Sequence, residues 1–304
     1  MRAVVTGDLG FLGRHFTRKL KACGFDVLGV DVKRGGMRTN DCRYLFNTST
    51  DRYDLAIHAA AVVGGREAIE GRPLDLTVNF DLDLAYMRWL LATRPRHAVY
   101  FSSSAVYPIT LQDTDLVPRQ LWEHDLNTVK YVGVPDEIYG WTKLVGEELM
   151  RRVRDAGVDV TVVRPFSGYG ADQDLTYPFP TFIRRGLACA ADPELPFDVW
   201  GPGTQVRDFV HVDDVVAATL NAVARPDVQV TNVCTGIATS FVDLAREVLK
   251  QVAPTREPNR IVTHPAKPTG VAYRVGSPRQ MFKFYAPKVS LPEGITSALE
   301  VSRG

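Results

Sequence analysis

Three glycines near the start of the chain constrain its fold more than any other sequence feature. A short apolar and β-branched run from Arg2 to Thr6 predicts a strand. Residues 11–23 have helical spacing, and Gly24 follows them as a common residue after a helix end. Between these two elements the glycines form the pattern Gly-x-x-Gly-x-x-Gly, at Gly7, Gly10 and Gly13. The chain is therefore predicted to begin with a strand, a glycine-rich turn and a helix, an arrangement that cradles phosphate groups.

The same turn and the next strand predict a dinucleotide site. The first glycine allows the tight turn, the second lets the backbone approach a pyrophosphate, and the third allows close packing of helix and strand. Asp31 ends the second predicted strand, where an acid accepts hydrogen bonds from the adenosine ribose and repels a 2′-phosphate. This position favours NAD over NADP, although Lys33 and Arg34 follow closely and weaken the preference.

The first half of the chain alternates strands and helices. Apolar runs predict further strands at 26–31, 55–58, 98–101 and 158–163, and a long helix is expected from Leu74 to Ala92. Near-continuous apolar strands separated by helices are typical of a parallel sheet that is covered on both faces. We therefore predict an α/β fold with a Rossmann-type doubly wound parallel sheet.

After Pro165 this alternation loosens. Proline and aromatic residues become frequent, and strand-like runs return only at 209–212 and 228–233. The second half is thus predicted to be a smaller lobe that is interleaved with the last strands of the sheet. The expected division assigns residues 1–165 plus 206–236 to a dinucleotide-binding domain, and residues 166–205 plus 237–304 to a C-terminal substrate lobe.

Composition limits the classes of function. The 304 residues are 45% hydrophobic, which suffices for a large core, and the net charge of +1 gives no indication of a nucleic-acid partner. The four cysteines form no Cys-x-x-Cys pair and no metal-binding spacing with histidine, so free thiols and no metal site are expected. No apolar run approaches the roughly 20 residues of a membrane span, and the chain starts directly with a strand. A cytoplasmic protein without a membrane segment is expected.

A tyrosine and a lysine four residues apart give the first indication of chemistry. Residues 138–153 have helical spacing, so Tyr139 and Lys143 are expected on one face of a helix. A free phenol has a pKa of about 10 and is a poor base at neutral pH, but a neighbouring ammonium lowers that pKa. The serines at 102–104 follow a predicted strand, and a serine there can hydrogen-bond the same reacting oxygen. Such a set moves a proton on or off a hydroxyl while a hydride leaves or reaches the carbon.

Together these features resemble the extended short-chain dehydrogenase/reductase family, in its NAD-dependent nucleotide-sugar epimerase/dehydratase branch. The resemblance covers nearly the whole chain. Its motifs occur in order at the glycine turn, Asp31, 57–61, Asn79, 101–107, 139–143, 164–166 and 207–214. It implies NAD bound along the first lobe and a nucleoside-diphosphate sugar held by the second. It also implies a homodimer built from two helices of each subunit.

The resemblance gives roles to individual residues. It implies that Tyr139 is the base, that Lys143 holds the nicotinamide ribose and lowers the pKa of the tyrosine, and that Ser103 is the catalytic serine. The implied cofactor contacts are Gly7, Leu9, Gly10, Phe11, Leu12, Gly13, Asp31, Ala59, Ala60, Ala61, Asn79, Ser102, Tyr139, Lys143 and Pro165. The implied substrate contacts are Ser103, Ser104, Tyr139, Ser167, Arg207 and Arg274.

Some of these roles have structural alternatives. Arg207 resembles the arginine that pairs with the diphosphate, since its planar fork suits phosphate oxygens, but an ion pair with Asp213 or Asp214 is the alternative. Asn79 either lies near the nicotinamide or is an ordinary helix residue. His58 is interpreted as a packed residue at a strand end rather than as a catalyst.

Other positions depart from the family pattern. Ser167 stands where many members have asparagine, and Lys267 replaces the usual late arginine unless Arg274 substitutes for it. Residues 108–136 form a longer segment than in common epimerases. This segment is interpreted as a cover over the sugar pocket, with a surface elaboration as the alternative, and it carries Trp122, His124, Lys130 and Tyr131.

The residues after the predicted catalytic serine separate the reactions of this branch. The resemblance implies an acid and a base here in 4,6-dehydratases, a glutamate in decarboxylases and a cysteine in 3,5-epimerases, but this chain has Ser104 and Ala105. The expected reaction is therefore epimerisation at C4 of a nucleoside-diphosphate sugar with a self-recycling NAD. One alternative is an NAD(P)H-dependent 4-ketoreductase of a deoxysugar nucleotide. Another is a non-catalytic member that senses the dinucleotide, which the presence of Tyr139 and Lys143 disfavours.

Overall fold

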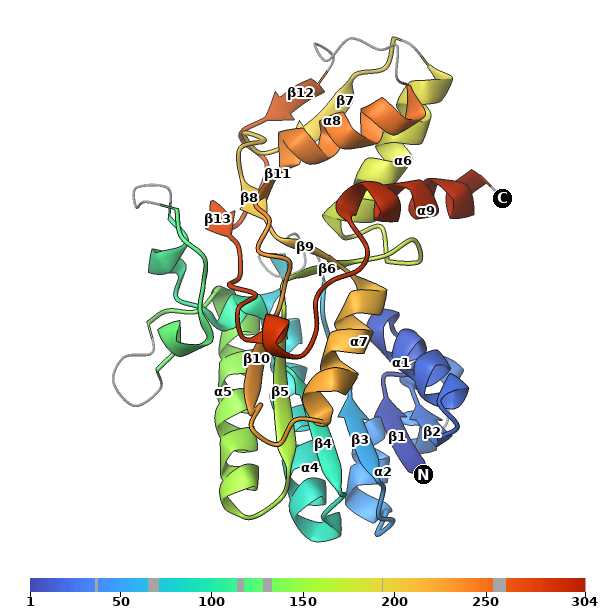
Figure 1. Ribbon diagram of the computed structural model, residues 1–304, viewed down its shortest axis with the longest axis vertical. Helices are drawn as coiled ribbons and strands as arrows, with labels where there is room; N and C mark the ends of the chain where they lie inside the picture. Colours follow the sequence, from blue (N-terminus) through green and yellow to red (C-terminus); the bar gives the residue numbers. More distant parts are fainter. Residues whose placement is uncertain are drawn as a thin grey trace.

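A six-stranded parallel sheet forms the centre of the lower lobe in Figure 1. The computed structural model describes residues 1–35, 38–64, 71–113, 118–127, 133–192, 194–253 and 261–303. The strand order is β10-β5-β4-β3-β1-β2, with β1 Arg2–Thr6, β2 Asp26–Val30, β3 Leu55–His58, β4 His97–Phe101, β5 Val160–Pro165 and β10 Val230–Val233. The order reverses at β1, and ligands of such sheets bind beyond the carboxyl ends of the strands at this switch point. The predicted doubly wound α/β fold is confirmed.

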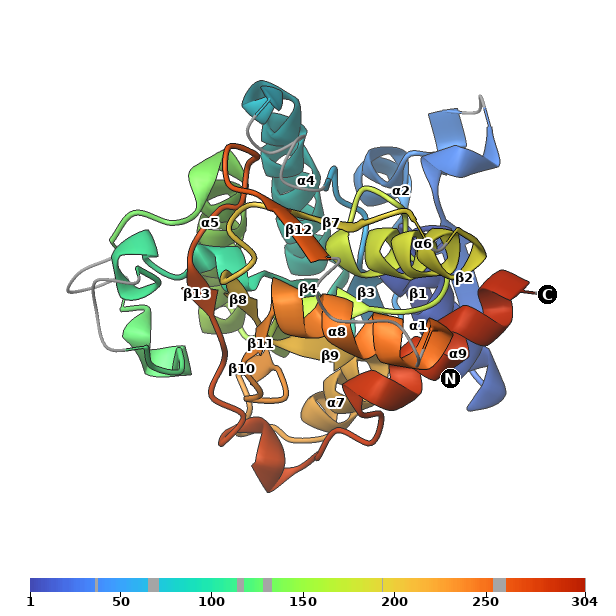
Figure 2. The ribbon, with the colours of Figure 1, turned by 90° about the horizontal axis from the view of Figure 1, so that it is seen from above.

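Helices cover both faces of this sheet. One face carries α1 (Phe11–Ala22) and α7 (Val212–Val223), and the other carries α2 (Cys42–Thr48), α4 (Val78–Thr93) and α5 (Glu137–Asp155), as Figures 1 and 2 show. Successive strand residues point to opposite faces, so Val4 joins the core beneath α4 and α5 whereas Val5 joins the core beneath α1 and α7. Burial on both faces explains why the strands read as continuous apolar runs.

Short 3-10 turns connect these elements. They span Val32–Arg34, Arg38–Asn40, Pro73–Thr77, Ser104–Val106, Ile109–Leu111, Glu123–Asp125 and Met281–Lys283. The long helix expected from Leu74 is divided in this way. Pro73 opens a separate 3-10 turn, and α4 begins only at Val78. The predicted helix is therefore right for most of its length and wrong for its first turn.

The smaller lobe lies above the carboxyl ends of the sheet strands in Figure 1. Its helices are α6 (Pro178–Ala191), α8 (Phe241–Val252) and α9 (Leu291–Arg303), and they enclose a core of their own. Its short strands form three small sheets: β6 (Ser167–Tyr169) with β9 (Phe209–His211), β7 (Phe197–Trp200) with β12 (Ile261–His264), and β8 (Val206–Arg207) with β11 (Thr239–Ser240) and β13 (Tyr273–Arg274). The chain passes between the two lobes several times, and the residue boundaries that divide them stay a prediction.

The cysteines are free thiols, as expected. Cys23 is an exposed free thiol, and Cys42, Cys189 and Cys234 are buried free thiols. Among the described residues, no helix combines the length and the apolarity that crossing a membrane requires.

A buried aspartate joins three segments where the lobes meet. The Asp208 carboxylate accepts hydrogen bonds from the Thr235 amide at 2.8 Å, the Thr235 hydroxyl at 2.7 Å, the Gly236 amide at 2.9 Å and the Gly276 amide at 3.2 Å. Its own carbonyl accepts from the Ser167 amide at 2.9 Å. Buried backbone N–H groups are costly when they lack a partner, so this carboxylate fixes the loops that follow β10 and β13.

Replacing this carboxylate should destabilise the whole chain. Asp208→Ala leaves three backbone amides, those of half-buried Thr235 and Gly236 and of buried Gly276, without their acceptor. We expect the free energy of unfolding to fall by about 3 kcal/mol in a urea titration. Asp227→Ala is the matched control, because its side chain is 66% exposed and pairs with exposed Arg225, so a loss of about 0.5 kcal/mol or less is expected. Equal losses in the two variants would contradict the role given to Asp208.

Candidate active site

The glycine turn packs tightly against the turn that follows β3. Gly7 has a φ of +72°, and a Cβ added to it would lie 2.6 Å from the Ala60 amide nitrogen. A Cβ added to Gly13 would collide with the Gly7 carbonyl. The turn is closed by hydrogen bonds from the Gly7 amide to the Val30 carbonyl at 2.7 Å and from the Gly10 amide to the Gly7 carbonyl at 2.9 Å. Side chains are thus excluded from the positions where a dinucleotide backbone must approach, and the residues present fit NAD.

Asp31 closes the adenosine end of this turn. Its buried carboxylate follows β2 and accepts hydrogen bonds from the Leu9 amide at 3.0 Å and the Lys33 amide at 2.8 Å. Each carboxylate oxygen accepts more than one hydrogen bond, so capacity remains for the two hydroxyls of a ribose. The acid therefore orders the glycine turn and remains chemically suited to the predicted ribose contact.

Asn79 fixes the segment that follows β3. It is buried at the start of α4, where its amide oxygen accepts from the Val62 amide at 2.8 Å and its amide nitrogen donates to the Val62 carbonyl at 2.9 Å. These bonds hold the segment after Ala59, Ala60 and Ala61 in place. Asn79 is thus more than an ordinary helix residue, and its direct contact with the nicotinamide stays a prediction.

The predicted catalytic residues meet where β4 ends and α5 begins. Ser103 follows β4, and its hydroxyl accepts a hydrogen bond from the Ala105 amide at 3.1 Å. The Asp136 amide, just before α5, donates to the Ala105 carbonyl at 2.9 Å. Tyr139 and Lys143 lie in the first two turns of α5, four residues apart. The structure therefore brings the serine turn and the tyrosine–lysine helix against each other.

Two glycines of α5 permit this close approach. A Cβ added to Gly140 would lie 2.5 Å from the Ala105 carbonyl oxygen, and a Cβ added to Gly146 would collide with the Tyr100 hydroxyl. Glycine inside a helix costs about 1 kcal/mol relative to alanine, so a glycine at such a position usually has a packing reason. These glycines are the sequence signal for the close contacts of α5.

Lys143 sits in a buried polar network that the sequence did not predict. Its ammonium lies 5.1 Å from the centre of the Tyr100 ring, and the Tyr100 hydroxyl donates to Asp83 Oδ2 at 2.6 Å. His58 Nε2 lies 3.5 Å from Asp83 Oδ1, and His58 Nδ1 is 2.7 Å from the Thr6 hydroxyl. Burial lowers the pKa of His58, although Asp83 opposes this shift. His58 is packed at the end of β3, as expected for a structural residue.

Ser102 belongs to a second buried network of hydrogen bonds. The Ser102 hydroxyl donates to Glu147 Oε1 at 2.5 Å, and Arg164 donates to both oxygens of Glu147, at 2.8 and 2.7 Å. Arg164 also donates to the Tyr107 hydroxyl at 3.0 Å. Ser102 and Arg164 thereby join α5 to the ends of β4 and β5. Ser104, a predicted substrate contact, is buried in the 3-10 turn beside Ala105.

The predicted substrate residues of the smaller lobe lie on adjacent strands. In β8, Arg207 donates to the carbonyls of Val206, Thr269 and Val271, each at 2.8 Å. Arg274 is its partner in the register of β13. The alternative ion pair partner Asp214 instead accepts from the Tyr285 hydroxyl at 2.5 Å and the Lys288 and Val289 amides at 2.8 and 3.0 Å. These carbonyl contacts hold the guanidinium of Arg207 beside the loop at 269–271.

Arg274 connects the smaller lobe to the start of α5. Its guanidinium donates to Gln112 at 2.5 Å and to the Asp136 carboxylate, next to α5, at 2.9 Å. Ser167, in β6, has its amide bound by the Asp208 carbonyl. Pro165 ends β5 and pairs in register with Val233. The substrate contacts of these residues stay predictions.

Residues 121–123 of the long segment lie against the edge strand β10 of the sheet. Glu123 Oε1 accepts from the Asn232 amide of β10 at 2.8 Å, and the Asn232 side chain donates to the Leu121 carbonyl at 2.9 Å. Trp122 lies beneath Arg279, whose guanidinium carbon is 5.0 Å from the ring centre. Covering an edge strand satisfies its unpaired backbone groups. The part at 118–127 therefore favours the surface alternative over a sugar-pocket cover, and Lys130 and Tyr131 lie outside the described residues.

Tyr177 is a further residue near the site that the sequence did not indicate. It precedes α6 in the smaller lobe. Burial raises the pKa of Tyr177, and the electrostatic influence of Tyr139 adds to that shift. The two phenols are therefore within electrostatic range of each other, and no motif links them in the sequence.

Filling the glycine cradle should remove dinucleotide binding. Gly13→Ala places a methyl group against the Gly7 carbonyl, so we expect NAD affinity to fall by at least tenfold in a fluorescence or calorimetric titration, which corresponds to about 1.4 kcal/mol. Gly168→Ala is the control, because its Cβ would meet only Val215 at an ordinary distance of 4.0 Å. Unchanged NAD affinity in Gly13→Ala would contradict the placement of the cofactor.

Comparison with known proteins agrees with this geometry. Residues 3–234 match the NAD dependent epimerase/dehydratase family. The chain is 28% identical over 295 residues to the dTDP-4-dehydro-6-deoxy-D-allose reductase of Streptomyces bikiniensis, covering 90% of this chain and 86% of the relative. Among solved structures, MoeE5 in complex with UDP-glucose and NAD has a TM-score of 0.78 at 26% identity, over 100% of this chain and 99% of that chain.

The UDP-glucose 4-epimerase of Thermotoga maritima, solved with UDP-glucose, shares the fold. It has a TM-score of 0.80 at 24% identity, over 100% of this chain and 99% of that chain. The family match spans most of the chain, including the glycine turn and both predicted catalytic segments. The chain therefore belongs to the NAD dependent epimerase/dehydratase family, whose members are enzymes that use NAD.

Proposed function

We propose that the protein is an NAD-dependent epimerase of a nucleoside-diphosphate sugar that acts at C4 through a transient 4-keto sugar. The observation that carries the proposal is the turn after β4. Ser103 lies there beside the start of α5 with Tyr139 and Lys143, while the next two positions are Ser104 and a buried Ala105. An acid, a base or a thiol that would eliminate water or invert C3 and C5 is thus missing from these positions.

The chemistry asked of the chain is proton transfer at one oxygen. Tyr139 removes the proton from the C4 hydroxyl, and the Lys143 ammonium stabilises the phenolate that makes this possible at neutral pH. Ser103 hydrogen-bonds the same oxygen in both the hydroxyl and the keto form. NAD, when bound, supplies the acceptor and later the donor of the C4 hydride. The keto sugar rotates in the site so that its opposite face receives the hydride. Tyr139 then returns the proton to the oxygen at C4.

The position of Lys143 supports this role. Its ammonium is buried against the Tyr100 ring, and the carboxylate of Asp83 behind that ring favours a positive charge at this point. A lysine held in this way cannot swing to solvent, so its charge stays near Tyr139, one helical turn away. The arrangement therefore keeps a positive charge one helical turn from the phenol that the proposal makes the base.

A 4-ketoreductase of a deoxysugar nucleotide is the second candidate. It is favoured by the similarity to the dTDP-4-dehydro-6-deoxy-D-allose reductase, which covers most of both chains. The same serine, tyrosine and lysine serve both reactions, and the difference lies in whether the reduced cofactor is recycled or consumed.

We also propose a cytoplasmic homodimer in which α4 and α5 of two subunits pack together. Large apolar side chains are exposed on both helices, among them Leu91 on α4 and Trp141 and Val145 on α5, each between 37% and 39% exposed. Exposed apolar groups on adjacent helices favour a protein contact. The family resemblance is the second support for this assembly.

Removing one hydroxyl should separate catalysis from binding. Tyr139→Phe should lower turnover by about 10³-fold, because the base is lost, while NAD affinity remains near that of the unchanged chain. Tyr44→Phe, on the exposed side of α2, is the control and should leave turnover unchanged. Turnover that survives in Tyr139→Phe would contradict the role given to this residue.

Measuring whether the reduced cofactor is consumed during turnover should distinguish the two candidate reactions. A panel of UDP, dTDP and GDP sugars is first scored by thermal shift, because a ligand that binds the folded state raises its stability. With the sugar selected, we expect conversion to the C4 epimer while the absorbance of NADH stays constant. Stoichiometric oxidation of NADPH with a 4-keto sugar nucleotide, and no epimer, would establish the reductase instead.

A further inference from the structure

A buried aspartate occupies the glycine turn next to Gly7. Asp8 is only 3% exposed, and its side chain lies over β2. A Cβ added to Gly29 of β2 would collide with the Asp8 carboxylate, so the glycine at that position makes room for it. A carboxylate is costly to bury in this way unless a positive charge compensates it. The compensating group lies just beyond the end of β2.

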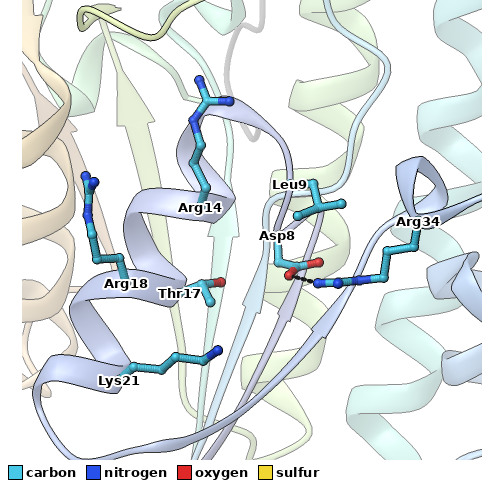
Figure 3. A pocket seen from close by; sticks show the side chains of 7 residues that line it. All are labelled: Asp8, Leu9, Arg14, Thr17, Arg18, Lys21 and Arg34. Atoms are coloured by element: carbon cyan, nitrogen blue, oxygen red, sulfur yellow. Dashed lines mark hydrogen bonds and ion pairs between the residues drawn. The ribbon is translucent and has the colours of Figure 1, made fainter. Parts of the chain in front are cut away.

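Arg34 is that compensating group. Its guanidinium Nη2 donates to Asp8 Oδ2, from the 3-10 turn that begins one residue after Asp31. Figure 3 shows the two side chains pointing toward each other at the edge of a cavity of about 460 Å³, with Arg14, Thr17, Arg18 and Lys21 of α1 around the rest of it. Arg34 is 41% exposed and reaches Asp8 from the solvent side. The cavity is rich in cations, and Asp8 is the acid in its lining.

The pair lies beside the predicted adenosine ribose. Asp31, the acid predicted to bind the ribose, accepts hydrogen bonds from the amides of Leu9 and Lys33. Leu9 directly follows Asp8, and Lys33 directly precedes Arg34. Burial raises the pKa of Asp8, Arg34 opposes that shift, and the negative charge of Asp31 adds to it. The carboxylates of Asp8 and Asp31 are therefore close enough to interact electrostatically. Arg34 lies between the glycine turn and the end of β2, where the 2′ position of the adenosine ribose is predicted.

We propose that Asp8 is a cofactor-selecting residue, which favours NAD over NADP by holding Arg34 in an ion pair. Arginine is the side chain best suited to a phosphate, because its planar fork binds two oxygens at once. A guanidinium that already neutralises a buried carboxylate is not available for a 2′-phosphate. The inference rests on the dinucleotide site of the proposed function and not on its sugar chemistry.

The consequence of moving Arg34 supports this selection. If Arg34 turned to a 2′-phosphate, Asp8 would lose its compensating charge while staying buried. Its second oxygen, Oδ1, already has no hydrogen-bond partner in the part of the chain that the structure describes. The charge of Asp8 would then add to that of Asp31 against the phosphate. Arg34, which the sequence suggested together with Lys33 as a residue that weakens the NAD preference, therefore does so less than its charge implies.

The test compares the affinities for NAD⁺ and NADP⁺ in matched variants. Asp8→Asn keeps the size of the side chain and removes its charge, so Arg34 is released. We expect the ratio of the two dissociation constants to move toward NADP⁺ by about tenfold at low salt, the scale of one charge-assisted hydrogen bond, and by less at high salt. Arg34→Gln added to Asp8→Asn should remove this gain.

Asp172→Asn is the matched control. Asp172 pairs with Arg14, which lines the same cavity, so this variant also removes one negative charge from beside an arginine of that cavity. It should leave the NAD⁺/NADP⁺ ratio unchanged, because that arginine is not the one next to Asp31. Arg34→Gln alone provides a second route if Asp8→Asn does not fold. It leaves the charge of Asp8 uncompensated, so that charge adds to Asp31 against the 2′-phosphate, and NADP⁺ binding should weaken several-fold while NAD⁺ binding is kept.

Three results would overturn the proposal: an unchanged ratio in Asp8→Asn, an equal gain in Asp172→Asn, or a gain that persists without Arg34. Wild-type protein that binds both dinucleotides equally would also overturn it, with the proposed sugar chemistry untouched. Conversely, the predicted shifts in a protein that converts no sugar nucleotide would support the role of Asp8 and contradict the proposed function.

Discussion

The contact between the turn after β4 and the first turn of α5 is the constraint on which the rest of the site depends. The Ala105 carbonyl accepts a hydrogen bond from the Asp136 amide and lies against Gly140, where a Cβ would come within 2.5 Å. Any side chain at this glycine moves α5 away from the sheet, and Tyr139 and Lys143 move with it. The proposed chemistry thus depends on the absence of a side chain at Gly140 as much as on the side chains of Tyr139 and Lys143.

Buried charges then fix α5 in its position. Lys143 and Glu147 are one helical turn apart and both face the sheet, where Lys143 lies on the Tyr100 ring and Glu147 binds Arg164. Replacing one member of a buried ion pair costs several kcal/mol, although the pair as a whole adds little net stability. Such pairs therefore fix the position of α5 more than they stabilise the fold. A fixed helix keeps Tyr139 near the oxygen on which it is proposed to act.

The parts of the site that the sequence predicted belong to recurring motifs. The glycine turn and the tyrosine–lysine pair on one helical face are local patterns with a fixed geometry, and Asp31 follows the glycine turn at the regular spacing of a strand–helix–strand unit. Asp83, Glu147 and Asp8 were not predicted as site residues, because their partners lie 17, 17 and 26 positions away and are chosen by the tertiary fold. The salt bridge from Arg274 to Asp136 spans 138 positions, and only the folded chain brings the two together.

The central claim is that this site oxidises and re-reduces C4 of one sugar with its own NAD, and the fate of the C4 hydrogen tests it most directly. The sugar nucleotide that the panel selects is prepared with deuterium at C4 and converted in ordinary water. We predict that the epimer keeps its deuterium at C4 and gains no solvent hydrogen at C3 or C5, by mass spectrometry and NMR. Loss of the C4 label, or exchange at C3 or C5, would contradict the account.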